Sequence, residues 1–423
     1  MLGATLTYRL ARAGIRVTLL ESSEAAGGLA GSMQLGPHTV DRFYHVIAPS
    51  DARMLSMIEE LGLSGDLSFA QTRVGFYIDD ALHALDGIAD LARFAPLSVP
   101  QRARLAWFVA QCQLRTRQGR LDGVPLERWV RRHCGEAMWI RLWRPLLDSR
   151  LDGHPEALPA TYLWARTRRM AGARRGAGQG EQFASLRGGH QALVNAMITA
   201  AKARGAEVVT GCRVDGIVRA RDGGIDGVMA RDTVWPFDLT VCTLPSPLLC
   251  GFLPDDLVAR LHGMPSRGLG VVCVAATVRQ SVSPFYSINI CEPASITTVI
   301  EASHVVGTEH TGGKRLLYIP RYCAPDAPEQ QESDDRILAR FTADLTRMFP
   351  GFSREQIVDW NVQRVRYVEP VHELGAGRRL PPVWGLMPRL ALASSAQIYP
   401  WPLNGEASMR MAQALEDSVL ERL

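Results

Sequence analysis

The chain has 423 residues, which is more than one hydrophobic core usually supports, so two or more domains are expected. Its composition, with 47% hydrophobic and 21% charged residues, excludes a disordered chain and is compatible with the burial of a large ligand. The net charge of +4 is spread along the sequence rather than gathered in one tail, so no nucleic-acid partner is expected.

Signals for export or for a membrane span are missing from the sequence. No apolar run reaches the roughly 18 residues that a spanning helix needs, and the N-terminus has no signal-peptide pattern. The eight cysteines form no C-x-x-C pair and no metal-ligand spacing, which is typical of reduced thiols in a core. We therefore expect a cytoplasmic protein without a metal site, and peripheral contact with a membrane stays open.

The first predicted elements are a helix, a tight turn and a strand that ends in an acid. Residues 3–14 have apolar side chains on one helical face, and the strand 15–20 is followed by Glu21. In a dinucleotide-binding βαβ unit, Gly3 would be the third glycine of G-x-G-x-x-G and Glu21 the acid that binds a ribose hydroxyl. The first strand and the first two glycines of this unit would precede Met1, so we expect the sequence to lack them.

A second glycine motif follows this acid. It reads Gly27-Gly28-Leu29-Ala30-Gly31-Ser32, and Asp41-Arg42-Phe43-Tyr44-His45 comes soon after it. This turn resembles that of the flavin amine oxidases, protoporphyrinogen oxidases and carotenoid (phytoene) desaturases. The resemblance implies FAD as the cofactor, with the backbone of Gly27, Gly28 and Leu29 close to it because no Cβ of the two glycines intervenes. His45 either faces the flavin or is hydrogen-bonded within the turn.

The resemblance also implies the fold class. We expect an α/β protein with an FAD-binding, Rossmann-like domain of the glutathione-reductase type and an inserted α+β substrate domain. The FAD-binding domain would be discontinuous, with residues 1–75, 184–250 and 385–423. A helical substrate subdomain would cover residues 76–183, and the sheet and helices of the substrate domain would cover residues 251–384.

The middle of the chain fits a helical block followed by a basic segment. Residues 102–164 show helical periodicity and hold five of the nine tryptophans. Most of these aromatic side chains are expected to be core. The following arginines would bind a carboxylate or phosphate of the substrate, lie against anionic lipid, or simply be solvated in a loop. They are Arg166, Arg168, Arg169, Arg174 and Arg175.

The chain then resembles a return to the cofactor domain. A glycine turn opens a helix at 186–193, a strand is expected at 207–210, and Val214-Asp215-Gly216-Ile217 matches the family's V-x-x-I strand. By resemblance, the backbone of Val214 meets the adenine. Thr243-Leu244-Pro245 is similar to the family's T-x-P element. Substrate-side strands are predicted at 269–278, 296–302 and 315–319, and an amphipathic helix at 335–348.

The last motif precedes a C-terminal helix. In the family, a strand, a proline-containing loop and a helix N-terminus pass the flavin, and the helix end suits the negative charge of reduced flavin. By resemblance, Ser395 replaces the usual acid at the ribityl chain, Leu403 contacts the flavin, and Tyr399 and Trp401 are candidates for the face of its ring.

These motifs predict an FAD-dependent oxidoreductase acting on a small, hydrophobic molecule. A hydride would leave a C–H or N–H bond for flavin N5, and the catalytic group would be the flavin itself. The strand 268–274 has no lysine, although many amine oxidases of the family carry one there, and this favours a protoporphyrinogen-oxidase-like or desaturase-like reaction. Two alternatives stay open: a flavin-dependent UDP-sugar mutase, and a truncated protein without FAD activity.

Overall fold

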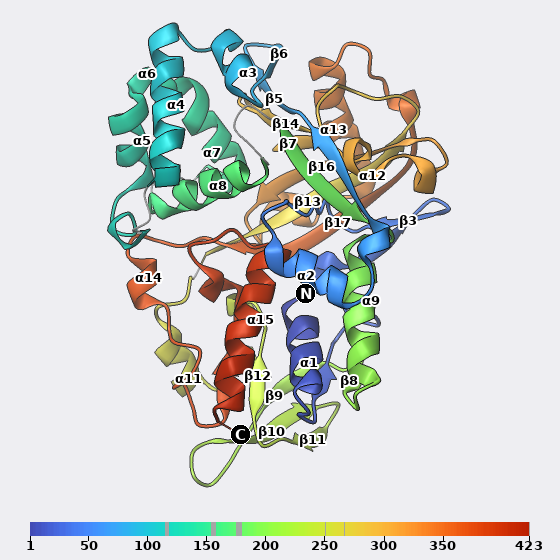
Figure 1. Cartoon of the computed structure of the whole chain (residues 1–423), viewed down its shortest axis with the longest axis vertical. Helices are drawn as coiled ribbons and strands as arrows, with labels where there is room; N and C mark the ends of the chain where they lie inside the picture. Colours follow the sequence, from blue (N-terminus) through green and yellow to red (C-terminus); the bar gives the residue numbers. More distant parts are fainter. Residues whose placement is uncertain (115–117, 154–157, 175–179, 250, 266, 423) are drawn as a thin grey trace.

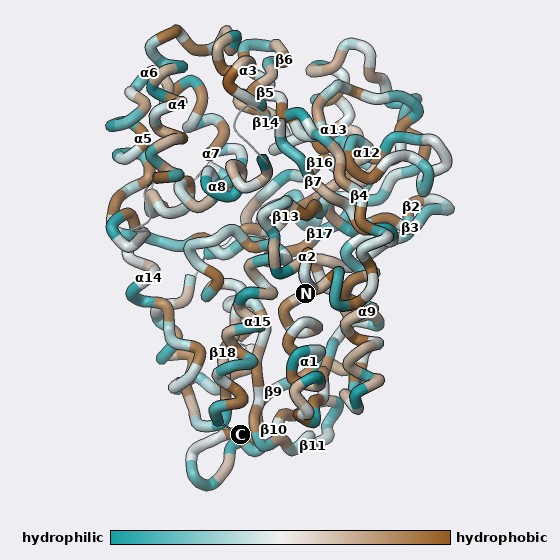
Figure 2. Tube along the Cα trace, in the orientation of Figure 1, coloured by the Kyte–Doolittle hydropathy of each residue, from teal (hydrophilic) through white to brown (hydrophobic). Residues whose placement is uncertain are grey.

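The computed structural model describes residues 1–114, 118–153, 158–174, 180–249, 251–265 and 267–422. The molecule is elongated and has two halves (Figure 1). One half contains both ends of the chain and the long helices α1, α9 and α15. The other half contains a large sheet with a group of helices beside it. Helices α1 and α9 carry both apolar and polar residues along their length (Figure 2).

The half with the termini is built from short parallel strands and three packed helices. Strand β1 pairs in parallel with β8, and β12 pairs in parallel with β18. Helix α1 packs against both α9 and α15. The elements are α1 (Leu2–Arg12), β1 (Thr18–Leu20), α9 (Gly189–Lys202), β8 (Glu207–Val209), β12 (Thr240–Cys242), β18 (Leu390–Leu392) and α15 (Gly405–Leu420). A three-stranded antiparallel sheet, in the order β11-β10-β9, lies at the end of this half; it comprises β9 (Val214–Arg219), β10 (Ile225–Ala230) and β11 (Thr233–Pro236).

The other half is organised around a seven-stranded sheet with the order β17-β13-β16-β15-β14-β5-β6. Its strands are β5 (Val74–Ile78), β6 (Ala81–Ala84), β13 (Gly268–Val278), β14 (Ser287–Ile290), β15 (Thr298–Glu301), β16 (Arg315–Cys323) and β17 (Ile357–Pro370). Alternate residues of β13 enter two different cores, Val272 and Val274 one and Val271 and Cys273 the other. Both faces of β13 are therefore covered, which explains its uninterrupted apolar sequence.

Helix α13 (Asp334–Met348) covers one face of this sheet and buries Ile337, Phe341 and Leu345 against it. The structure confirms the predicted helix at 335–348, with one more residue at its start. It also has strands at each of the three predicted positions between residues 268 and 323.

A group of helices flanks the sheet, as Figure 1 shows. Its main members are α3 (Ile88–Arg93), α4 (Val99–Leu114), α5 (Leu126–Cys134), α7 (Arg144–Leu151) and α8 (Thr161–Gly172). Four of the five tryptophans of this block are buried in its core, which also includes Phe108: Trp129, Trp139, Trp143 and Trp164. The fifth, Trp107, is 62% exposed on α4.

Two pairings cross the domain boundaries expected from the sequence. Strands β5 and β6 belong to the seven-stranded sheet rather than to the helices. Strand β4 (Leu67–Thr72), which precedes the helical segment, pairs with β7 (Glu181–Leu186), which follows it, so the two ends of this segment lie side by side. Strands β2 (Ser32–Leu35) and β3 (His38–Asp41) form an antiparallel pair, and helix α2 (Ala52–Glu60) packs against α15. Within the described residues, no helix combines the length and the apolar character that crossing a bilayer requires.

Candidate active site

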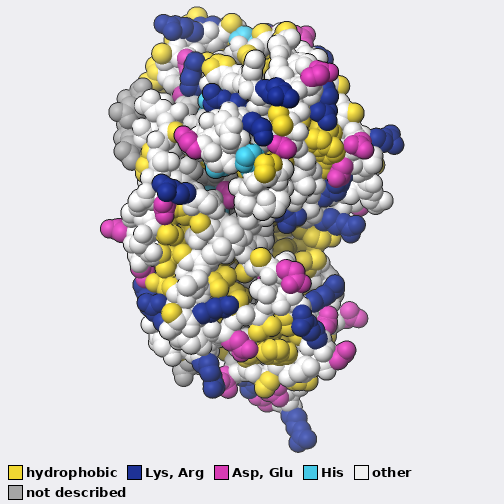
Figure 3. All heavy atoms as spheres, turned by 90° about the vertical axis from the view of Figure 1, so that its right-hand side faces the viewer, with side chains coloured by type: hydrophobic (Ala, Val, Ile, Leu, Met, Phe, Trp, Pro, Cys, Tyr) yellow, Lys and Arg dark blue, Asp and Glu magenta, His cyan; other side chains and the backbone are white. Residues whose placement is uncertain are grey.

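One cavity of about 2950 Å³ extends through both halves of the molecule. The molecule narrows between the halves, and hydrophobic side chains gather near this waist (Figure 3). The cavity wall includes most of the residues that the sequence motifs single out, although they come from distant parts of the chain. They are Gly3, Glu21, Gly27, Gly28, Leu29, His45, Val214 and Leu403. The fold therefore brings these eight residues to one space.

The glycine turn leaves room that larger residues would occupy. Gly28 has a φ of +58°, which glycine adopts readily, and a Cβ built there would meet no atom within 4 Å. A Cβ on Gly27 would lie 2.5 Å from Oε1 of Gln191. The Gln191 side chain is itself held, since its Nε2 donates to the carbonyl of Ala26 at 2.8 Å. The turn is thus a fixed backbone surface that is open toward the cavity, and it fits the pyrophosphate of FAD.

Gly3 and Glu21 lie on the same wall. The third glycine of a dinucleotide-binding motif usually allows a helix to pack closely on the sheet, but Gly3 is not needed for such packing here. A Cβ on Gly3 would stand 3.6 Å from Leu19 and 3.8 Å from Thr243, which are ordinary contacts. Close packing of α1 on the strands therefore does not require this glycine. Glu21 follows β1, and its Oε1 accepts a hydrogen bond from the Ser23 amide at 2.8 Å, so its second oxygen is available to a ribose hydroxyl.

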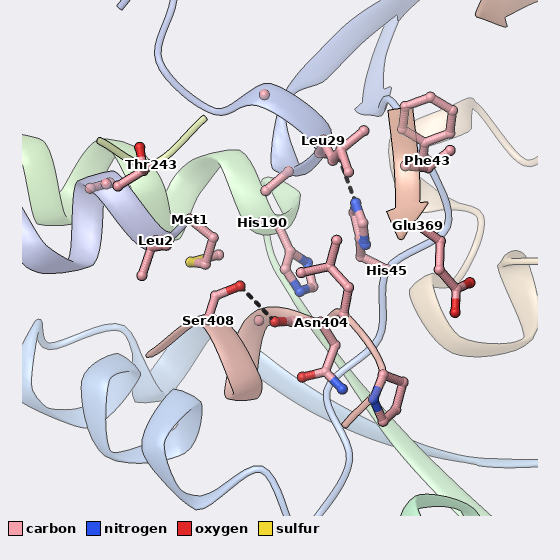
Figure 4. Close-up of a pocket in the computed structure, with 18 of the residues that line it drawn as sticks. Met1, Leu2, Leu29, Phe43, His45, His190, Thr243, Glu369, Asn404 and Ser408 are labelled. Atoms are coloured by element: carbon pink, nitrogen blue, oxygen red, sulfur yellow. Dashed lines mark hydrogen bonds between the residues drawn. The ribbon is translucent and has the colours of Figure 1, made fainter. Parts of the chain in front are cut away.

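The N-terminus of α15 also faces the cavity. Asn404 is the N-cap, and its Oδ1 accepts a hydrogen bond from the Ala407 amide at 2.8 Å. Leu403, Asn404 and Ser408 line the cavity wall, as the close-up in Figure 4 shows for the last two. The positive end of a 16-residue helix here would stabilise negative charge on a flavin pyrimidine ring.

His45 links the glycine turn to a second histidine. Its Nε2 is 2.7 Å from the carbonyl oxygen of Leu29, and its ring centroid is 4.9 Å from that of His190 (Figure 4). Burial and the nearby His190 lower the pKa of His45 to about 4. The imidazole is therefore neutral near pH 7, and its Nε2–H donates to Leu29. His45 is thus hydrogen-bonded to the glycine turn, which is one of the two roles that the sequence predicted for it.

Three candidate residues lie outside this cavity. Ser395 begins the 3₁₀ helix η9 (Ser395–Ile398), and it lines a small separate cavity together with Tyr399 and Trp401. The Tyr399 hydroxyl donates to Asp122, and Trp401 packs against Trp164 with ring centroids 5.7 Å apart. Leu403 lines both cavities. The side chains of Tyr399 and Trp401 thus contact the helical block, and their contact with a flavin ring stays a prediction.

The described arginines of the basic segment, residues 166–174, do not form a solvated loop. Three of them lie on the helix α8, and those that line the cavity are paired with carboxylates. Arg166 pairs with Glu369, Arg169 with Asp51, and Arg174 with Glu181, while Arg175 lies outside the described residues. These ion pairs connect α8 and the segment after it to other parts of the fold.

Sequence reasoning missed a polar group in the apolar part of the cavity. Arg150 on α7 lies there with Tyr44, Tyr162 and Tyr322. These four residues come from four separate segments, so no local motif joins them. The only sequence signal was an arginine near Leu147 and Leu151 within the helical block predicted at 102–164.

Comparisons with known proteins agree with the geometry of the site. A family model described as "Flavin containing amine oxidoreductase" matches residues 3–400. Protoporphyrinogen oxidase of Bos taurus is 27% identical over 295 residues, covering 60% of this chain and 60% of that protein, and the human enzyme matches equally. The match thus spans about 60% of the length of these curated relatives.

Solved structures share the fold over almost the whole chain. An oxidoreductase from Methanosarcina mazei has a TM-score of 0.75 at 16% identity and covers 99% of this chain and 98% of its own. A putative protoporphyrinogen oxidase from Exiguobacterium has a TM-score of 0.73 at 17% identity, covering 100% and 96%. A reduced UDP-galactopyranose mutase has a TM-score of 0.71 at 14% identity, covering 99% and 93%.

At these identities the structural matches show the fold alone, whereas the family model covers nearly the complete sequence. The family model describes flavin-containing proteins, and the site is compatible with a flavin cofactor, since the open glycine turn and the end of α15 face one space. The chain belongs to the flavin-containing amine oxidoreductase family.

Proposed function

We propose that this protein is an FAD-dependent oxidoreductase that dehydrogenates a hydrophobic small molecule, in a protoporphyrinogen-oxidase-like or desaturase-like reaction. The observation that carries the proposal is the continuity of the cavity, which joins the cofactor-binding wall to an apolar chamber. That chamber is lined by Phe76, Leu105, Leu142, Leu146, Leu163 and Val271, among others. An apolar wall of this extent favours a substrate with much apolar surface and excludes bulk water from it.

The residues of the chain would bind and orient the reactants. Gly28, Glu21, Val214 and Leu403 would hold FAD, which when bound supplies the acceptor, at N5, for a hydride from a C–H or N–H bond. The neutral His45 would keep the glycine turn in place through its hydrogen bond to Leu29. The N-terminus of α15 would favour the reduced state of the cofactor by its positive end.

The positions of the two lysines argue against amine oxidation. Nζ of Lys314 lies 3.4 Å from Oδ2 of Asp359, and Lys202 is the last residue of α9. Neither belongs to the wall of the cavity as the described residues define it, and β13 contains no lysine. A lysine that positions water at flavin N5, as in many amine oxidases of the family, has no counterpart on this strand.

A flavin-dependent sugar-nucleotide mutase is the second candidate, because the fold also matches UDP-galactopyranose mutase. A diphosphate requires several unpaired positive charges. In the cavity, Arg166, Arg169 and Arg174 are already paired with carboxylates. The charge balance of the wall therefore favours the oxidoreductase.

The test begins with the purified chain and added FAD. We expect a bound flavin spectrum, and we expect anaerobic bleaching of that spectrum by a hydrophobic substrate such as protoporphyrinogen, with porphyrin fluorescence as the product signal. UDP-galactopyranose is incubated with the reduced protein in parallel. Furanose product without substrate oxidation would favour the mutase, and failure to bind FAD would overturn the proposal.

A further inference from the structure

We propose that the substrate carries a carboxylate and that Arg150 binds it within the apolar chamber. This inference rests on the proposed function, because it specifies the substrate class of the same cavity. The side chain of Arg150 extends from α7, which packs against β14 and β16. Both buried neighbours on this helix, Leu147 and Leu151, are apolar, so the guanidinium is the charged group that α7 contributes to the cavity wall.

Arg150 has no carboxylate partner among the described residues, although two acids lie close to it in sequence. Asp148 is within 3.4 Å of Arg144 on the outer side of the same helix. Asp152 accepts a hydrogen bond from Arg321 at 2.8 Å and another from the Ala324 amide at 2.9 Å. Since both acids are used elsewhere, the charge of Arg150 is left for a ligand. Arg150 is half-buried at the cavity wall, where a cation without a counter-ion is costly, and a substrate anion would remove that cost.

Three tyrosines surround the guanidinium and supply further donors. The Cζ of Arg150 is 5.4 Å from the ring centroid of Tyr322, whose hydroxyl is 2.6 Å from that of Tyr44. Tyr162 lies close enough to interact with Arg150. Its buried hydroxyl nevertheless makes no hydrogen bond of normal geometry within the described structure. The guanidinium fork and the adjacent Tyr162 hydroxyl together match the two oxygens of one carboxylate.

The charge balance around this group favours a single bound carboxylate. The adjacent Arg166 stacks on Tyr162 at 3.5 Å, but its charge is neutralised by Glu369, which lies at the cavity wall in Figure 4. Arg169 is likewise paired, and Arg174 lies between two carboxyl groups, Asp86 and Glu181. The arginines at this end of the described cavity thus leave about one net positive charge. One carboxylate satisfies that charge, whereas a diphosphate would remain undercompensated.

The test uses three probes with the same ring and linker but different charge: 4-phenylbutanoate, 4-phenylbutanol and 4-phenylbutylamine. Their affinity for the purified protein is measured by calorimetry, with and without FAD. We expect the anion to bind best. The Arg150→Met variant should weaken the anion about 10-fold or more, as loss of a charge-assisted hydrogen bond implies, and change the alcohol less than about 3-fold.

Arg144→Met is the matched control, because Arg144 lies on the same helix with its side chain 56% exposed. This variant should leave all three affinities unchanged. Equal binding of the anion and the alcohol, undetectable binding of the anion, or an equal loss for both in Arg150→Met would overturn the proposal. So would Arg150-dependent binding of UDP that is tighter than that of the anion. Because binding is also measured without FAD, these results stand apart from a failure to bind flavin.

Discussion

Glu181 is a carboxyl group that the fold keeps from water at the cavity wall. It is 2% exposed, and burial, together with the nearby Asp86, raises its pKa to about 7 despite the opposing charge of Arg174. The folded pKa lies above the unfolded value, so the group stabilises the fold below about pH 4.5. That contribution, on the order of 3 kcal/mol, is lost as the pH rises through about 7.

We therefore expect Glu181→Gln to reduce the loss of unfolding free energy between pH 5 and pH 8. Urea unfolding of both proteins at the two pH values measures the difference. Glu373→Gln is the control, because this side chain is 53% exposed. If Glu181→Gln and the natural protein lose the same free energy over this interval, the carboxyl group is already ionised in the fold.

Gly28 allows a direct test of the cofactor wall. Gly28→Ala should cost about 1 kcal/mol in stability because of its φ of +58°, and its new Cβ would enter the open space of the cavity. Gly62→Ala should have the same backbone cost, since Gly62 has a φ of +73° and no atom within 4 Å of the added Cβ. Only Gly28→Ala should weaken FAD binding, measured by flavin fluorescence. Equal FAD affinity in the two variants would place the cofactor elsewhere.

At the scale of elements, one ion pair ties α8 to the half with the termini. Asp51 is 1% exposed. Its carboxylate accepts one hydrogen bond from the Ala48 amide at 2.8 Å and another from Nη2 of Arg169 at 3.0 Å. Asp51→Ala leaves this arginine without its partner and should cost about 3–5 kcal/mol. Asp148→Ala breaks an exposed pair on α7 and should cost less than about 1 kcal/mol. Chemical denaturation measures both; similar costs would show that the Asp51 pair is solvated.

The elements also show what local sequence predicts. Helix α13 and strand β13 agree with their predicted ranges within one residue, because amphipathic periodicity and an uninterrupted apolar run reflect the faces that each element buries. The parallel pairing of β5 with β14 was not predictable in this way. It joins segments about 200 residues apart, and such pairing depends on the packing of the complete sheet rather than on either strand.

The same limit applies to the site. Gly28, Glu21 and Leu403 were predicted from motifs that place them at fixed offsets, and the fold brings them to one cavity. The partners of the arginines were not found. The pairing of Arg166 with Glu369 spans the chain from α8 to β17, and charge in the sequence alone gives no sign of which acid will be near.

For the whole molecule, the cavity wall runs from Met1 to Val419 in the sequence, so cofactor binding should stabilise distant elements together. At a free FAD concentration 100 times its Kd, the gain in unfolding free energy is about 2.7 kcal/mol, or about 3 °C in Tm if the chain unfolds as one unit.

Amide hydrogen exchange tests which elements bound FAD stabilises. We expect slower exchange at the Ala30 amide, which closes the glycine turn onto the Gly27 carbonyl at 3.0 Å, and in the first turn of α15. The exposed side of α4 around Trp107 should exchange at the same rate with and without FAD, because it contributes no backbone to the turn or to the end of α15. Protection at the glycine turn without protection of α15 would mean that the flavin ring does not reach that helix, and would move the reacting end of the cofactor away from the apolar chamber.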